Sequence, residues 1–192
     1  MIAPADVERL AAEMPAHLHA SVVLAAWCGL RWGETRELRR TDVAVDASVL
    51  HVRRAVTYRD GSFSVGQPKT KAGVRDVAVP PHIRPIIKAH LKNHLRRAAD
   101  ALLFPDDDGT HLRADRYRTH WEVRAGTGKP TPRVDDLRHV GAVLAAPSGA
   151  TTAELMHRLG HTTPRMALRY QHVAEGRDAE IAERLSKLAE HG

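Results

Sequence analysis

The hydrophobic pattern changes its period twice along the chain, and this change constrains the fold more than any other feature. Between residues 49 and 79 apolar and polar side chains alternate, whereas the segments on either side repeat apolar residues at the spacing of a helix. Asp60-Gly61 separates two of the alternating runs and is a strong signal for a hairpin turn. The sequence therefore predicts a mainly α fold of the α+β class with one small three-stranded antiparallel sheet, its strands at residues 49–58, 63–65 and 74–79.

Helix start and stop signals divide the remaining chain. Gly29 and Gly160 each end a helical run, and Thr151-Thr152-Ala153-Glu154 has the pattern of a capping box. Thr163-Pro164 begins a helix that we expect to continue through Tyr170. The predicted helices are residues 7–11, 20–28, 32–40, 82–99, 115–124, 135–146, 151–160, 163–170 and 175–190. In the helix at 32–40 a solvated face is predicted for Glu34, Arg36, Glu37, Arg39 and Arg40.

Composition narrows the class of protein. A chain of 192 residues corresponds to one domain, and its 43% hydrophobic content excludes a disordered chain. No apolar run is long enough to cross a membrane, and the first residues lack the pattern of a signal peptide, so we expect a cytoplasmic protein. Lys and Arg total 29 against 23 Asp and Glu, which favours an acidic partner such as nucleic acid. The arginine richness is equally typical of a GC-rich genome.

Cysteine and histidine argue against a metal site. The single cysteine, Cys28, excludes a disulfide framework and a cysteine-based zinc site. His157 and His161 are four residues apart, but Gly160 ends the predicted helix between them, so their rings need not share a face. No cysteine or paired carboxylate completes a site beside His90 and His94. We therefore expect no metal.

Five motifs follow one another along the chain. Each alone is a weak indication of function, whereas their common order and spacing are a strong one. They are Cys28-Gly29-Leu30-Arg31-Trp32-Gly33-Glu34, the hairpin loop Lys69-Thr70-Lys71-Ala72-Gly73, Asp136-Leu137-Arg138-His139, Leu159-Gly160-His161 and, nine residues after His161, Tyr170. The set resembles the catalytic domain of the tyrosine recombinases, the phage-integrase family of site-specific DNA recombinases. The resemblance covers nearly all of the chain.

The resemblance implies roles for individual residues. Arg31 and Arg138 would clamp the phosphate, His161 would assist them, and Tyr170 would be the nucleophile. Lys71 would be the lysine of the hairpin loop, with Lys69 as the alternative. The candidate DNA-contacting residues are Lys69, Arg75, His139, Arg165 and Arg169. The implied partners are double-stranded DNA and, in the synaptic complex, three further copies of the protein, with a monomer expected away from DNA.

The chemistry of strand transfer explains why these residue types are needed. A phosphodiester under attack gathers charge on its non-bridging oxygens, which two guanidinium groups bind in bidentate fashion. A tyrosine hydroxyl has a pKa of about 10, so it needs cationic neighbours or a base before it attacks. A lysine supplies the proton that the 5′-oxygen needs on leaving. The 3′-phosphotyrosyl product keeps the bond energy, so rejoining requires no ATP, metal or other cofactor.

Two features depart from the family pattern. Asp135 occupies the position three residues before Arg138, where the family usually has a histidine, and losing such an acid–base group typically costs roughly 10²–10⁴ in rate. Asp135 stays among the candidate catalytic residues, because its carboxylate would be a weaker base that accepts the proton of Tyr170. Family members also carry an N-terminal DNA-binding domain, whereas this chain begins where the catalytic domain should begin. We therefore expect residues 1–192 to be a catalytic domain: a fragment, an isolated domain or a minimal relative.

These departures leave a second class of function open. A degenerate integrase domain would bind DNA or a partner integrase without cutting, although such a protein needs no nucleophile. Relaxation of DNA in the manner of a type IB topoisomerase would use the same chemistry. Residues 175–192 are expected to form a terminal helix that is exchanged between protomers or packs on its own domain.

Overall fold

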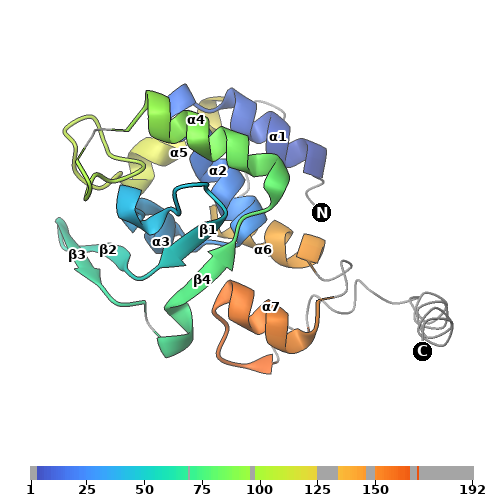
Figure 1. Ribbon diagram of the computed structural model, residues 1–192. Helices are drawn as coiled ribbons and strands as arrows, with labels where there is room; N and C mark the ends of the chain where they lie inside the picture. The colour runs from blue at the N-terminus through green and yellow to red at the C-terminus, as the bar shows by residue number, and fades with distance from the viewer. Residues whose placement is uncertain are drawn as a thin grey trace, which may run out of the picture.

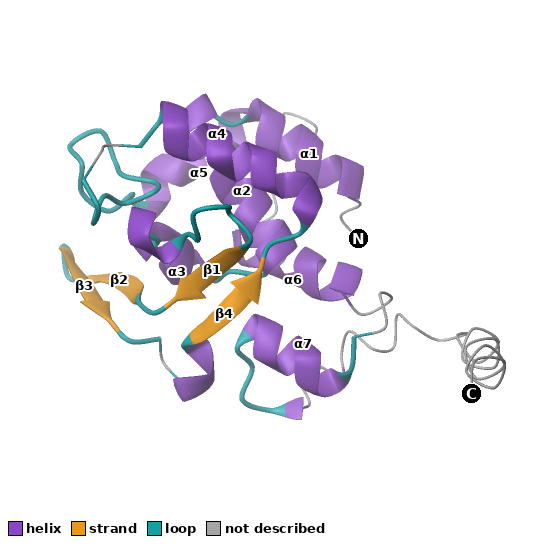
Figure 2. Ribbon diagram, viewed as in Figure 1, coloured by secondary structure: helices purple, strands orange, loops and turns teal. Residues whose placement is uncertain are grey.

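The computed structural model describes residues 4–68, 70–95, 98–124, 134–145, 150–164 and 168. Helices make up most of the molecule, and one of its two short antiparallel strand pairs lies at the edge, so the mainly α fold with a small antiparallel sheet content is confirmed (Figures 1 and 2). In chain order the elements are α1 (Pro4–Glu13), α2 (Ala16–Cys28), α3 (Trp32–Glu37), β1 (Val49–Val52), β2 (Ala55–Arg59), β3 (Ser62–Gly66), β4 (Arg75–Ala78), α4 (Arg84–Asn93), α5 (Ala114–Arg124), α6 (Val134–Ala145) and α7 (Thr152–Leu159).

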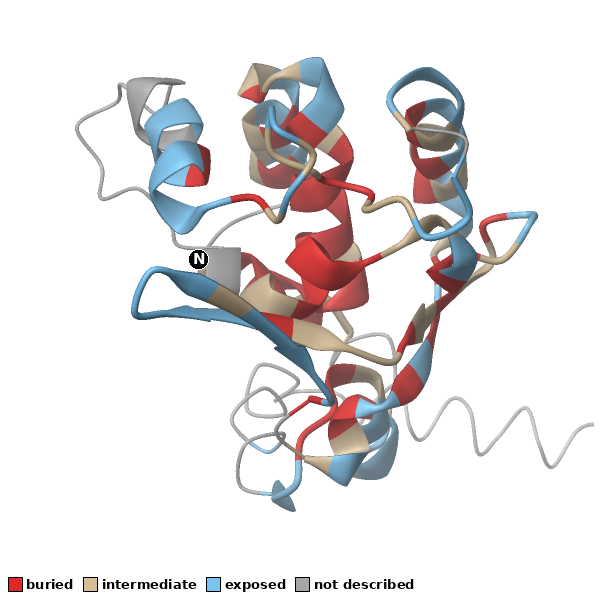
Figure 3. Cartoon of the chain, turned by 90° about the vertical axis from the view of Figure 1, so that its left-hand side faces the viewer, coloured by how far each residue is buried: buried red, intermediate tan, exposed pale blue. Residues whose placement is uncertain are grey.

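Helix α2 is the centre of the core. It is apolar on nearly all sides and buried along most of its length, as expected for a helix with neighbours all round it (Figure 3). Helix α6 packs closely against it at Gly141, where an added Cβ would lie 2.2 Å from the carbonyl oxygen of Ala26. Helix α2 ends at Gly29, whose φ of +64° is the left-handed conformation that glycine adopts most readily.

The strands form two antiparallel pairs. The predicted hairpin is present, because β2 and β3 pair from Ala55 opposite Gly66 to Arg59 opposite Ser62 around the Asp60-Gly61 turn. The prediction of one three-stranded sheet was wrong in its strand count. The first predicted strand divides after Val52, which pairs with Arg75 of β4, whereas Ala55 begins the pairing with β3. The chain changes partner between β1 and β2, which produces two sheets of two strands.

The helix predicted over residues 82–99 is also shorter than expected. A 3-10 turn at Pro81–Ile83 leads into α4, which ends at Asn93. The chain then returns to the segment after α3, where the amide of Arg40 donates to Ala101 and the amide of Leu103 donates to Leu38. These two bonds flank Leu102, which forms an antiparallel bridge with Arg39.

Some predicted segments lie outside the described residues. They are the connector at residues 126–130, most of the helix predicted at residues 163–170 and the terminal helix at 175–190. Among the helices that the structure describes, none is long and apolar enough to cross a membrane.

Candidate active site

The last turn of α7 is the point on which the candidate site is built. Thr151 caps the start of this helix, because its hydroxyl accepts from the amide of Glu154 and the Glu154 carboxylate accepts from the Thr151 amide. The helix ends at Gly160, whose φ is +64°. The final carbonyls of a helix have no partner within the helix and carry its partial negative charge. They therefore attract cationic donors.

Three arginines from three other elements donate to consecutive carbonyls of this turn. Arg75 on β4 donates from Nε to Arg158 (2.9 Å), and Arg138 on α6 donates from Nη2 to Leu159. Arg31, which precedes α3, donates from Nη2 to Gly160 (2.7 Å). The end of α7 thus gathers guanidinium groups from segments that are distant in sequence.

Arg31 is the most accessible of the three arginines. Its side chain is 37% exposed, and its Nη1 donates to Oε1 of Glu34 at 2.8 Å. The Glu34 carboxylate is 1% exposed and also accepts from the Arg31 backbone amide. Burial by itself would raise the pKa of this carboxyl, but the hydrogen bonds and charges of Arg75 and Arg31 outweigh it and lower the pKa. Glu34 is therefore a buried carboxylate that orients Arg31.

Arg138 joins the ends of two helices. Its Nη1 donates to the carbonyl of Gly29, just after α2, and its Nη2 donates to Leu159 at the end of α7. The residue is buried. The close contact of α6 with α2 at Gly141 sets the position from which Arg138 reaches both carbonyls.

His161 follows this turn directly. The residue is buried, and its backbone amide donates to the carbonyl of Met156 at 2.9 Å. Burial, followed by the positive charges of Arg138 and Arg31, lowers the pKa of the imidazole to about 4. His161 is therefore uncharged at neutral pH and interacts with a ligand as a hydrogen-bonding group rather than as a cation.

The predicted lysine loop meets the same turn. Lys71 begins a 3-10 turn, Lys71–Gly73, and is exposed. The carbonyl of the next residue, Ala72, lies so close to Gly160 that a Cβ there would be 2.8 Å from it. Gly160 therefore lets the lysine loop approach the arginines. Lys69, the alternative lysine, lies outside the described residues.

The other predicted site residues are distributed as follows. Asp135 lies in the first turn of α6, one turn before Arg138, and the structure describes its backbone only. His139 is exposed beside Arg138. Tyr170, the predicted nucleophile, lies outside the described residues, as do Arg165 and Arg169. Arg31, Arg138 and His161 are brought together, and the turn that begins with Lys71 lies against the same end of α7.

Two expectations need correction. Arg75 was predicted to contact DNA, but its side chain is 1% exposed and its guanidinium group donates to Glu34, Gly73 and Arg158, so it does not present itself to a ligand. The solvated face predicted for residues 32–40 is also wrong, because Glu34, Arg36 and Glu37 are buried. We interpreted the alternating charges of this short helix as a face exposed to solvent, whereas Glu34 and Glu37 form ion pairs in the interior.

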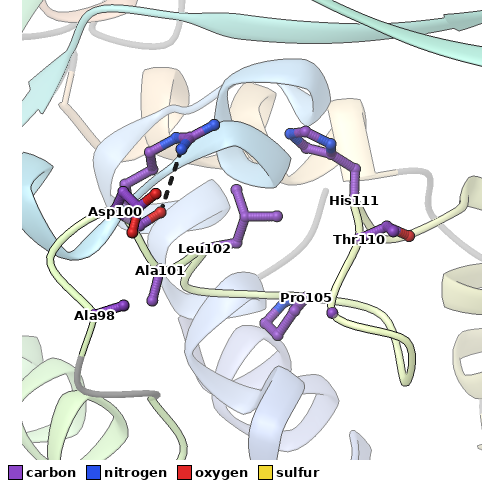
Figure 4. A pocket seen from close by; sticks show the side chains of 9 residues that line it. Ala98, Asp100, Ala101, Leu102, Pro105, Thr110 and His111 are labelled. Carbon is purple, nitrogen blue, oxygen red and sulfur yellow. Dashed lines mark hydrogen bonds between the residues drawn. The ribbon is translucent and has the colours of Figure 1, made fainter.

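Glu37 is the centre of a second buried cluster. Its carboxylate accepts from Arg39 (2.7 Å), Arg54 (3.2 Å) and the ring of His111. Arg39 and His111 also line a pocket of about 420 Å³. Figure 4 shows Leu102 and Pro105 on the wall of this pocket, and it is not lined by Arg31, Lys71, Arg138 or His161, the predicted catalytic residues whose side chains the structure describes.

Comparisons with known proteins bear on this arrangement. The profile of the Phage integrase family matches residues 1–177. The prophage phiRv2 integrase of Mycobacterium tuberculosis is 50% identical over 189 residues, which are 97% of this chain and 50% of that protein. The integrase of Mycobacterium phage L5 is 42% identical over 193 residues, 98% of this chain and 52% of that protein. The chain thus spans about half the length of these curated relatives.

A solved structure shares the fold. The Tn1549 transposon integrase, in complex with transposon right end DNA, superposes with a TM-score of 0.76 at 18% sequence identity. The match covers 98% of this chain and 65% of that one.

Proposed function

The chain belongs to the phage integrase family, and we propose that it catalyses site-specific DNA recombination. In this proposal the enzyme cuts one DNA strand with Tyr170, holds the 3′ end as a phosphotyrosyl link and rejoins it to a new partner. The convergence of Arg31 and Arg138 on the last turn of α7, directly before His161, is the observation that carries the proposal.

The two arginines supply charge where the reaction needs it. A phosphodiester in the course of strand transfer places negative charge on its non-bridging oxygens, and fixed guanidinium groups stabilise it without reorganising. Arg31 is partly exposed and so is able to meet a phosphate from solvent, while Arg138 is buried and fixed in place by its bonds to two carbonyls. The neutral His161 would add a hydrogen bond to the same phosphate.

Tyr170 is the favoured nucleophile partly because of where the other tyrosines lie. The chain has three tyrosines. Tyr117 is buried in α5 with its hydroxyl 3.0 Å from that of Ser21, and burial raises its pKa. Tyr58 lies on β2 with its ring 4.7 Å from that of Phe63. Both elements lie away from α7 (Figure 1).

The experiment that tests the proposal captures the covalent intermediate. The protein is incubated with a pool of nicked duplexes of randomised sequence, in which cleavage releases a short fragment and prevents rejoining. We expect a denaturant-resistant protein–DNA adduct that Tyr170→Phe abolishes and that the matched variants Tyr58→Phe and Tyr117→Phe retain. Adduct formed by Tyr170→Phe, or no adduct from the unaltered protein, would refute the proposal.

Lys71 is the proposed general acid, because it is exposed on a loop that touches Gly160. Lys71→Ala should slow cleavage by roughly 10²–10⁴, the range for an acid–base group. A duplex with sulfur in place of the leaving 5′-oxygen needs no proton, so it should restore most of the rate to this variant. If Lys69→Ala instead shows this loss and this rescue, the general acid is Lys69.

The proposed partners are double-stranded DNA and further copies of this chain. We propose that four protomers assemble on paired DNA sites in the bacterial cytoplasm, and that residues 175–192 dock onto a neighbouring protomer. Removing residues from Gly176 onward should then impair recombination more than binding to a single DNA site. Equal loss of both would contradict the exchange.

A further inference from the structure

We propose that Arg75 is a positioning residue that keeps Arg31 available for the phosphate by holding the Glu34 carboxylate. This inference rests on the proposed function, because it assigns a part in the same site to a residue that touches no substrate. Arg75 acts through Glu34 and Arg31 rather than on DNA.

The carboxylate of Glu34 is shared between the two arginines. Its Oε1 accepts from Nη1 of Arg31 at 2.8 Å and from Nη1 of Arg75 at 3.0 Å. Its Oε2 accepts from the Arg31 backbone amide at 2.9 Å and from Nη2 of Arg75 at 3.0 Å. Arg75 therefore makes a bidentate ion pair with Glu34, whereas the Arg31 side chain makes a single contact through Nη1.

This sharing of the Glu34 carboxylate determines the orientation of the Arg31 guanidinium. Because Arg75 occupies both carboxylate oxygens, the other terminal nitrogen of Arg31, Nη2, turns away to the carbonyl of Gly160. The Glu34 and Arg75 side chains are each 1% exposed, so water does not compete for their pairing. Arg75 thus neutralises the buried carboxylate, and the charge of Arg31 remains available to a ligand.

Loss of Arg75 would reverse this division. A buried carboxylate needs a partner, and Arg31 is then the remaining arginine that already contacts it. The Arg31 guanidinium should rotate into a bidentate pair with Glu34, the geometry that arginine and carboxylate favour. Its Nη2 would no longer donate to the carbonyl of Gly160, and its charge would neutralise Glu34 instead of stabilising the phosphate.

Arg75 also connects the remaining parts of the site. Its Nη1 donates to the carbonyl of Gly73 at 2.9 Å, in the turn that begins with Lys71, and its Nε donates to Arg158 on α7. A single buried side chain therefore contacts the segment that carries the proposed acid, the helix that leads to His161 and the carboxylate that orients Arg31.

The first arm of the test does not depend on activity. We would determine the crystal structure of Arg75→Gln, with Arg116→Gln as the matched control. Arg116 lies on α5 and pairs with Asp106 at 2.7 Å, away from α7. In Arg75→Gln we expect Arg31 to pair with both oxygens of Glu34 and to leave the Gly160 carbonyl, whereas Arg116→Gln leaves Arg31 in place. An unchanged Arg31 in Arg75→Gln would overturn the proposal.

The second arm measures the rate of adduct formation at saturating DNA. Arg75→Gln should slow it by about 10- to 100-fold, less than the roughly 10²–10³ expected when a transition-state donor is lost outright. DNA affinity should change by less than about threefold, because Arg75 makes no contact with DNA; a general structural defect would lower affinity as well.

A double variant separates positioning from folding. Glu34→Gln combined with Arg75→Gln removes the buried charge that would capture Arg31, so the rate should recover relative to Arg75→Gln alone. If Arg75 only stabilises the fold, the double variant should be no faster than the single one, and this result would overturn the proposal. If Arg75→Gln does not fold, Arg75→Lys takes its place in both arms, because a lysine keeps the charge but cannot pair with both carboxylate oxygens in the bidentate way of arginine. If the unaltered chain forms no adduct, the proposed function fails, while the position of Arg31 in the crystal still decides the positioning role.

Discussion

At the scale of single residues, Gly160 is the position where a small change should have the largest effect. Its φ of +64° disfavours any side chain, and an added Cβ would lie 3.1 Å from Nη1 of Arg75 and 3.3 Å from Nη1 of Arg31. The same Cβ would press on the Ala72 carbonyl in the lysine loop. Gly160 therefore holds the arginines and the loop at their present separation.

Gly160→Ala should consequently cost about 1–2 kcal/mol of stability from its backbone conformation and also slow DNA cleavage. Gly61→Ala is the matched control, because Gly61 has a φ of +79° and no atom within 4 Å of an added Cβ. Thermal unfolding should show a loss of stability in both variants, and only Gly160→Ala should lose adduct formation. Equal cleavage rates in the two variants would contradict this view of the turn.

Asp135 is the residue at which this chain departs from the family. It lies one helical turn before Arg138, and a carboxylate there repels a phosphate. Asp135→His should therefore speed adduct formation, by up to the ~10²–10⁴ that an acid–base group contributes. The matched change Asp136→His, one residue further along, should not. A slower Asp135→His enzyme would mean that the carboxylate has itself become the base.

The site residues that could be predicted were those whose neighbours in sequence form a motif. Arg31, Arg138 and His161 each stand beside a helix end marked by glycine or by an apolar run, and the structure brings them together. Glu34 and Arg75 were misjudged, because nothing local distinguishes a charged residue on the surface from one paired in the interior. Glu34 and Arg75 pair with each other, although they are 41 residues apart in the sequence.

At the scale of elements, the site depends on how closely α6 approaches α2. Gly141→Ala would place a methyl group 2.2 Å from the Ala26 carbonyl, so α6 must shift outward. Overpacking of this kind typically costs about 1–3 kcal/mol. Because Arg138 is on the same helix, cleavage should fall as well. Gly66→Ala, where no atom lies within 4 Å, should leave both properties unchanged, and a Gly141→Ala protein that matches it would contradict the close-packing argument.

The elements themselves were more predictable than their pairing. The Asp60-Gly61 turn specifies the β2–β3 hairpin locally, so the sequence revealed it. The partner of β4 is β1 instead of the neighbouring β3, and this choice depends on packing against the helices. The bonds that join residues 38–40 to residues 101–103 after α4 likewise connect segments that are distant in sequence, which no local pattern records.

At the scale of the whole molecule, buried histidines should make the fold sensitive to acid. Burial lowers the pKa of His90 and, with the charges of Arg138 and Arg31, lowers that of His161 to about 4. An unfolded histidine titrates near about 6.5, so below that pH the unfolded chain binds more protons than the folded one. The free energy of unfolding should therefore fall as the pH drops from about 6.5 towards 4.

Melting temperatures measured between pH 7 and pH 5 test this expectation. The melting temperature of the unaltered protein should fall across this range, and His161→Gln should reduce the fall by removing one of the groups responsible. His157→Gln is the control, because His157 is exposed on α7, the helix that leads to His161. A melting temperature that is the same at pH 7 and pH 5 would contradict the linkage.

The central claim is that a phosphate held at the end of α7 is attacked by Tyr170, and mass spectrometry of the trapped adduct tests it most directly. After nuclease and trypsin digestion, the nucleotide should be attached to the peptide of residues 170–177, and the released strand should carry a free 5′-hydroxyl. Arg138→Ala should yield no such peptide, because the charge that stabilises the transition state is lost. A nucleotide on the peptide that contains Tyr58 or Tyr117, or a protein linked to the 5′ end, would contradict the mechanism.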